Sequence, residues 1–167
     1  MSILSQEVDA VQNPALASVL LWRFTIAYAA APQAPVATPL PALFVVLPLL
    51  FDEDTASMLA STMTSSGLRH FADKFTQSRV AKTDILLVLE RRAKALRPQT
   101  LEALAFALKA RLLSLDKAAG GVVALSQAPP LSLPESVKPL VRNAEKLGTW
   151  SGSLSLFELS ATLNVAF

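Results

Sequence analysis

Residues 24–51 carry no charged side chain, and this uncharged stretch constrains the fold of the 167-residue chain more than any other feature. A membrane-spanning helix needs about 20 consecutive apolar residues. Here four prolines between residues 32 and 41 interrupt the stretch, and proline breaks a helix interior. The apolar segment before the prolines contains Arg23, which is costly in lipid. We therefore expect buried or partner-covered helices; a membrane-associated helical protein is the less favoured alternative.

The overall composition supports a globular chain with extra buried surface. Hydrophobic residues make up 52% and charged residues 17%, against roughly 25% charged in an average soluble domain. This excludes a disordered chain and favours a subunit that contacts partners. The chain has no cysteine, which excludes disulfides and thiolate metal sites and fits a reducing compartment. Residues 1–13 contain Glu7 and Asp9 and no basic residue. A secretory signal is therefore not expected, and we predict a cytoplasmic location.

Caps and helix breakers predict a mainly helical chain. Asn13-Pro14 is typical of a helix start, and the acidic run 52–54 is typical of another. Residues 31–41 and 127–134 form proline-rich linkers, and residues 42–51 form either a buried strand or a short helix. The expected helices cover about 14–30, 55–64, 68–74, a segment from 83 or 84 onward, a segment from 98 to about 109, 134–146 with Gly148 as its stop, and 155–163.

A β-hairpin is predicted after the central helices. Two strand-like runs, Arg111–Asp116 and Val122–Ser126, flank a turn that contains Gly120-Gly121. The order helix, helix, hairpin is that of a winged-helix domain. We predict a mainly α fold with a small β-hairpin, a winged-helix-like helical domain; a plain helical domain with an incidental hairpin is the alternative. The whole chain, 1–167, is expected to be one compact domain, with a winged-helix-like portion at 79–126 and a C-terminal helical portion at 127–167.

No constellation of catalytic or metal-binding residues emerges. His70 is the only histidine, and its one nearby carboxylate is Asp73, which is too few ligands for a metal site. Gly120-Gly121 is not followed by Lys-Ser or Lys-Thr, and Trp150 occupies the middle of Gly148–Gly152. The sequence therefore lacks a phosphate-binding loop and a nucleophile elbow. We expect no catalytic residue, no cofactor, no metal and no small-molecule substrate, and we predict that the chain is not an enzyme.

Basic residues are concentrated in the middle of the chain. Residues 79–111 hold eight basic and three acidic side chains. Such residues bind phosphates without reading sequence, and the mostly apolar helix near 99–109 offers few side chains for reading bases. The candidates for contacts to the DNA backbone are Arg91, Arg92, Lys94, Arg97, Lys109 and Lys117.

Large aromatic residues are concentrated where charge is sparse. Each of them, taken alone, is expected in the hydrophobic core. Together they present more apolar surface than the few charged residues can shield from water, so some are expected at an interface. Aromatic side chains are also enriched at protein interfaces. The predicted protein-interface residues are Trp22, Phe24, Tyr28, Phe44 and Trp150.

The order of several short segments resembles a known family. Asn13-Pro14-Ala15 leads into VLLWRFTIAY, followed by LPALFVVLPLLF; residues 144–150 (AEKLGTW) and 163–167 (LNVAF) come near the end. This order is similar to the middle component of bacterial three-component ABC systems, which overlap the Lamassu anti-phage and anti-plasmid systems. The resemblance transfers no catalytic residue.

The resemblance implies a small accessory subunit in a DNA-associated complex. It would bridge an ATPase similar to the structural-maintenance-of-chromosomes (SMC) ATPases and an effector, commonly a nuclease, and regulate the release or activation of that effector. DNA is an expected partner through the complex, and whether this subunit itself contacts DNA stays open. The alternative is a stand-alone winged-helix regulator that binds DNA itself.

Overall fold

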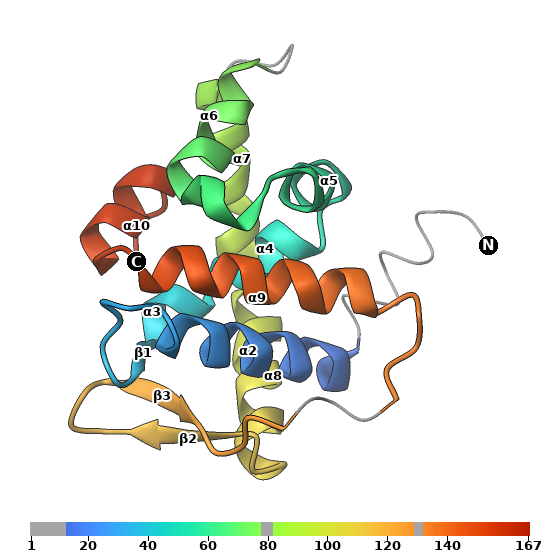
Figure 1. Ribbon diagram of the computed structural model, residues 1–167, viewed down its shortest axis with the longest axis vertical. Coiled ribbons are helices and arrows are strands. Elements are labelled where there is room, and N and C mark those ends of the chain that lie inside the picture. The colour runs from blue at the N-terminus through green and yellow to red at the C-terminus, as the bar shows by residue number, and fades with distance from the viewer. Residues whose placement is uncertain (1–12, 78–81, 129–131) are drawn as a thin grey trace.

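The computed structural model describes residues 13–77, 82–128 and 132–167. The fold is mainly helical, as predicted, and the predicted hairpin belongs to a small three-stranded antiparallel sheet (Figure 1). No helix within these residues is long and apolar enough to cross a membrane. The elements are α2 (Pro14–Ala29), β1 (Thr38–Pro39), α3 (Leu40–Leu43), α4 (Val46–Leu50), α5 (Glu53–Ser61), η1 (Thr64–Ser66), α6 (Gly67–Gln77), α7 (Lys82–Ala95), α8 (Arg97–Lys109), β2 (Leu113–Asp116), β3 (Gly121–Ala124), α9 (Lys138–Gly152) and α10 (Leu156–Leu163).

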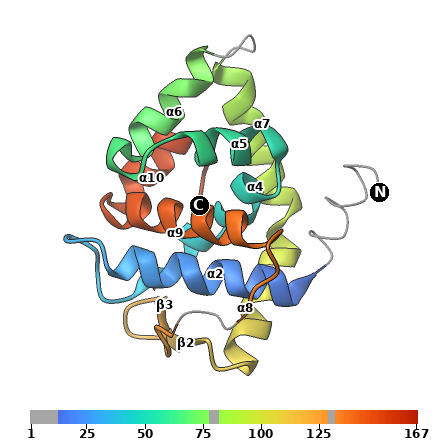
Figure 2. The same cartoon turned by 45° about the vertical axis from the view of Figure 1, so that its right-hand side comes forward.

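Helices α2 and α9 lie side by side at the centre of the molecule (Figures 1 and 2). The predicted start of α2 is confirmed, because Asn13 Oδ1 accepts a hydrogen bond from the Leu16 amide at 3.0 Å. Leu20, Leu21 and Phe24 are fully buried. The near absence of a polar face on α2 therefore reflects burial on most sides.

Helix α9 runs past the glycine that was expected to stop it. It continues through Gly148 to Gly152 because both glycines press against the backbone of α2. A Cβ on Gly148 would lie 2.4 Å from the carbonyl oxygen of Phe24, and one on Gly152 would lie 2.3 Å from that of Tyr28. Glycine serves here for close packing of two helices rather than for ending one.

The uncharged stretch folds into short elements. Residues 42–51, left open between strand and helix, belong to α3 and α4 and the turns beside them. The first proline-rich linker contains an unexpected strand, β1, which pairs with β3: Thr38 lies opposite Val122 and Pro39 opposite Gly121. β1 is an edge strand, where proline is tolerated.

The acidic run caps α5 as predicted. Asp52 Oδ1 accepts a hydrogen bond from the Thr55 amide at 3.0 Å, with Glu53 and Asp54 in the first turn. The helix ends at Ser61, earlier than expected, and the single turn η1 follows it.

Helices α7 and α8 run nearly end to end and pass behind α9 and α2 in Figure 1. Only Leu96 separates them. Its amide still donates to the Arg92 carbonyl at 2.8 Å, and its carbonyl accepts from the Thr100 amide at 2.9 Å. The backbone at Leu96 has φ −88° and ψ 3°, which departs from helical values. We call this break the kink, and the two hydrogen bonds bridge it.

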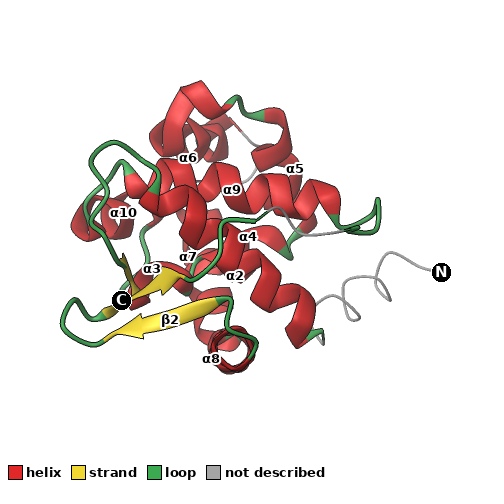
Figure 3. Cartoon of the chain, turned by 60° about the horizontal axis from the view of Figure 1, so that its bottom comes forward, coloured by secondary structure: helices red, strands yellow, loops and turns green. Residues whose placement is uncertain are grey.

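The hairpin is present where the sequence predicted it. Strands β2 and β3 pair antiparallel, with Leu113 opposite Ala124 and Asp116 opposite Gly121, and the sheet order is β1-β3-β2 (Figure 3). A helix-turn-helix has a turn of about 3–4 residues and a crossing near 90–120°. The single residue between α7 and α8 differs from that arrangement, and the winged-helix assignment stays a prediction. Residues 79–81 and 129–131, within the expected portions at 79–126 and 127–167, lie outside the described residues.

Candidate docking site at the junction of α7 and α8

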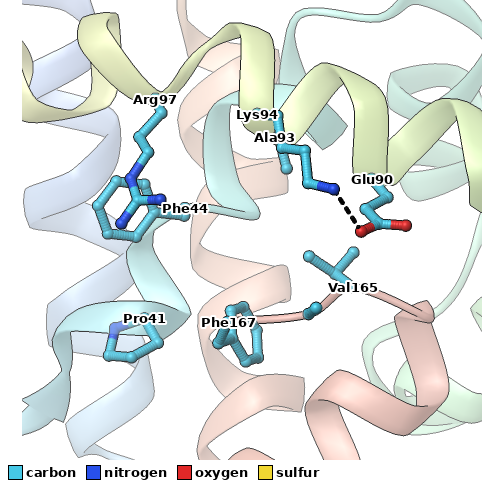
Figure 4. A pocket seen from close by; sticks show the side chains of 9 residues that line it. Pro41, Phe44, Glu90, Ala93, Lys94, Arg97, Val165 and Phe167 are labelled. Atoms are coloured by element: carbon cyan, nitrogen blue, oxygen red, sulfur yellow. Dashed lines mark ion pairs between the residues drawn. The ribbon is translucent and has the colours of Figure 1, made fainter.

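An apolar pocket lies where α3, the α7–α8 column and the C-terminal segment meet (Figure 4). Its free volume is about 90 Å³. The C-terminal segment reaches it because Val165, which follows α10, is buried in the main core. The lining residues are Pro41, Phe44, Glu90, Ala93, Lys94, Arg97, Val165, Ala166 and Phe167.

Helical spacing brings four of these residues to one face of the column. Glu90, Ala93, Lys94 and Arg97 are separated by three, one and three residues, which places them on adjacent turns of a helix. The hydrogen bonds of Leu96 with Arg92 and Thr100 carry this face across the kink. The spacing of these four residues in the sequence therefore indicated one wall of the pocket. It did not indicate that α3 and the C-terminal segment would form the opposite side.

The charged groups of the pocket are held at its edge. Lys94 Nζ lies 2.8 Å from Glu90 Oε1. The Arg97 guanidinium carbon lies 5.3 Å from the centre of the Phe44 ring, within range of a cation–π contact. The pocket thus has an apolar floor and a rim with one carboxylate and two cations.

The size of the pocket limits what it can hold. Small-molecule and cofactor sites usually measure about 300–1,000 Å³, several times the free volume here. A single aliphatic side chain is closer to this size. Protein interfaces often seat an anchor residue in an apolar recess with polar groups at its edge.

Four of the five predicted interface aromatics are core residues of this chain. Trp22, Phe24, Tyr28 and Trp150 are each at most 4% exposed. The two indoles donate internally, from Trp22 Nε1 to the Ser126 carbonyl at 2.8 Å and from Trp150 Nε1 to the Thr64 carbonyl at 2.6 Å. Their burial removes them from the surface. Phe44 differs, because it is half-buried and lines the pocket.

The six predicted DNA-backbone residues do not form one cluster. Arg92 Nη2 pairs with Asp52 Oδ2 at 2.6 Å. Lys94 and Arg97 belong to the pocket rim. The other three are exposed and have no ion-pair partner among the described residues: Arg91 in α7, Lys109 at the end of α8 and Lys117 in the hairpin turn.

A second hollow, about 460 Å³, lies between α5 and α9. Its polar groups are already engaged within the chain. Lys146 Nζ donates to the carbonyls of Leu59 and Thr62, each at 2.7 Å. Asn143 donates to the Ala56 carbonyl at 3.2 Å. Burial, aided by the charge of Lys74, lowers the pKa of Lys146. This hollow therefore offers few free groups for a ligand.

No group of three or more His, Asp or Glu residues could hold a metal ion within the part of the chain that the structure describes. His70 is exposed on α6.

Comparison with known proteins identifies the family of this chain. No curated protein and no solved structure matches it significantly. A family model for the middle component 3 of ABC-three component (ABC-3C) systems matches residues 1–167. The ordered segments pointed to the same kind of protein. The chain therefore belongs to the family of ABC-three component system middle components.

Proposed function

We propose that this chain is a non-enzymatic accessory subunit that bridges an SMC-like ABC ATPase and a nuclease-type effector. In this proposal the complex is a cytoplasmic, Lamassu-like defence system against phages and plasmids, and the subunit regulates release or activation of the effector. Family membership supports an accessory role with other components of the system. The finer assignments rest on the resemblance of the ordered segments described above.

The pocket at the α7–α8 junction carries the proposal. It is an apolar recess of side-chain size with Arg97 and Lys94 at its rim. We assign to it an aliphatic anchor residue in an acidic segment of one partner component. Such an anchor gains affinity from burial of apolar surface, and the cations fix its orientation.

The test is reconstitution of the complex with variants of the pocket. The chain is purified with the ATPase and effector components of its own system, and binding is measured by titration calorimetry. Ala93→Leu fills the pocket, and Arg97→Glu reverses a rim charge. Each is expected to weaken binding of one component at least tenfold, about 1.4 kcal/mol.

The matched control is Arg142→Glu, an equal charge reversal at an exposed position on α9. It is expected to leave binding unchanged. Binding of neither component by the unmodified chain contradicts the bridging function. Unchanged binding by both pocket variants contradicts the assignment of the pocket.

The alternative is a winged-helix regulator that contacts DNA directly. The order α7, α8, β2, β3 and the exposed Arg91, Lys109 and Lys117 favour it. It predicts salt-dependent binding of duplex DNA by the isolated chain, weakened by Arg91→Glu or Lys109→Glu. The accessory role predicts no such binding, which fluorescence anisotropy at low salt would measure.

A further inference from the structure

A row of exposed positions runs along the α7–α8 column, on a different side from the pocket. Successive members are three or four residues apart, so they stay on one face across the kink at Leu96. We call this row the outer ridge; it consists of Val88, Arg91, Ala95, Pro98, Glu102, Ala105 and Lys109.

Large apolar side chains flank the outer ridge at both ends. Leu87 is 49% exposed and Phe106 is 42% exposed. The exposed side of helix α8 therefore combines apolar residues with the charged Glu102 and Lys109. A surface helix normally presents polar residues to water, and a row of exposed apolar residues marks a contact surface.

We propose that the outer ridge is the contact surface for a second copy of this chain, packed antiparallel about a two-fold axis. The axis would pass between Leu96 and Arg97. In this arrangement each position meets the one equally far on the other side of the axis. Arg91 then faces Glu102 of the second copy, and symmetry forms the same ion pair twice.

The remaining positions match in the same register. Leu87 lies level with Phe106 of the second copy but on the opposite flank of the contact, so each packs beside a smaller residue of the ridge. Val88 meets Ala105, and Ala95 meets Pro98. Small residues at the centre allow the helices to approach closely, and the large ones cover the ends. The sequence of the ridge is thus complementary to its own reverse.

Other registers fit less well. A shift by one heptad keeps the same faces in contact. In one direction the shift sets Arg91 against Lys109, two cations. In the other direction it leaves the last turn of α8 beyond the start of α7. Only the register centred on the kink uses the full ridge and pairs opposite charges.

The pocket and the outer ridge can be occupied together. Successive residues of a helix are rotated by about 100°, which places Arg97 roughly a third of a turn and Ala93 nearly half a turn away from the centre of the ridge. A dimer formed through the ridge leaves the pocket open to another component. The two proposals rest on different residues and can fail independently.

The first test is the mass of the isolated chain in solution. Sedimentation equilibrium is measured between about 1 and 200 µM, because a two-helix contact falls at the small end of specific interfaces, which start near 1,200 Å². A dimer with a dissociation constant of about 10 µM is expected. A monomer throughout this range overturns the proposal.

Charge reversal tests the register. Arg91→Glu and Glu102→Arg should each weaken the dimer at least tenfold, because like charges then meet twice. The double variant should recover most of the lost affinity. Circular dichroism confirms that each variant is folded, and Lys117→Glu in the hairpin turn serves as the control. A dimer that none of these variants weakens overturns the ridge as its interface.

Cysteine cross-linking gives an independent measure, because the chain has no cysteine of its own. Val88→Cys mixed with Ala105→Cys should form a disulfide-linked heterodimer under mild oxidation. Either variant alone should not, since 17 residues of helix separate the equivalent positions by about 25 Å, beyond the roughly 7 Å limit for the Cα atoms of a disulfide. Equal cross-linking of Val88→Cys alone contradicts the register.

Discussion

Gly148 on α9 lies directly against the carbonyl oxygen of Phe24 on α2, so close that a Cβ at this position would be 2.4 Å from that oxygen. Gly152 makes the equivalent contact with Tyr28 one turn later. The central helix pair of the fold therefore depends on two positions without side chains. Alongside them, Arg23 Nε of α2 donates to Glu145 Oε1 of α9 at 2.7 Å.

We expect Gly148→Ala to destabilise the protein by at least about 3 kcal/mol, the upper part of the usual cost of overpacking. The added methyl group meets a backbone oxygen and cannot be accommodated by rotation of a side chain. The free energy of unfolding in urea measures this. Gly120→Ala is the control: its φ of 65° makes alanine unfavourable, but no atom lies within 4 Å. Its expected cost is about 1 kcal/mol. A smaller loss for Gly148→Ala than for Gly120→Ala would contradict the close contact.

The ion pair between Arg92 and Asp52 should contribute little by itself. Asp52 also caps α5, so Asp52→Ala is expected to cost about 1–2 kcal/mol. Arg92→Ala should cost less than 1 kcal/mol, because the Arg92 side chain remains partly open to water, which screens the pair. A double-mutant cycle separates the two effects, with an expected coupling of about 0.5 kcal/mol. A coupling as large as the capping effect would contradict this assignment.

Removal of the Lys146 ammonium should loosen the end of α5. Lys146→Met keeps most of the aliphatic stem but leaves the carbonyls of Leu59 and Thr62 without this donor. The expected cost is about 1–3 kcal/mol. Hydrogen exchange should show faster opening of α5 than of α2. Equal protection of the α5 amides from hydrogen exchange in the variant and the unmodified chain would contradict the prediction.

Acid should weaken the start of α10. Hydrogen bonds from the Ser155 amide and hydroxyl lower the pKa of Glu158, and the nearby Arg69 acts in the same direction. The lowered pKa in the folded state means that this contribution to stability is full above the ordinary pKa of a glutamate. It is lost as the pH falls through the folded value. Side-chain NMR titration measures that pKa, and Ser155→Ala should move it back upward. An unchanged pKa in Ser155→Ala would contradict the capping box.

Local signals in the sequence predicted much of the fold. The Asn13-Pro14 start, the Asp52 cap and the hairpin turn depend on neighbouring residues, and the structure confirms each of them. The predicted stop of α9 at Gly148 was wrong. A glycine that packs closely against another helix can lie within a helix instead of ending it. The contact with Phe24 that decides this is more than 100 residues away in sequence.

The candidate site was less accessible to prediction for the same reason. The sequence marked Phe44 as an interface residue and Lys94 and Arg97 as candidates for DNA contacts. That they line one pocket with Val165 and Phe167 depends on packing between segments far apart in the sequence. Trp22 and Trp150 were placed at an interface because their segments are apolar, whereas distant backbone carbonyls accept their indole hydrogens.

The pairing of α2 with α9 also governs when this protein can fold during its synthesis. Helix α2 leaves the ribosome early, with apolar residues around most of its circumference. The helix that covers it is formed by residues 138–152, so more than 100 further residues must be translated before α2 can be covered. Until then α2 exposes surface that promotes aggregation. We expect the growing chain to recruit chaperones and the finished chain to release them.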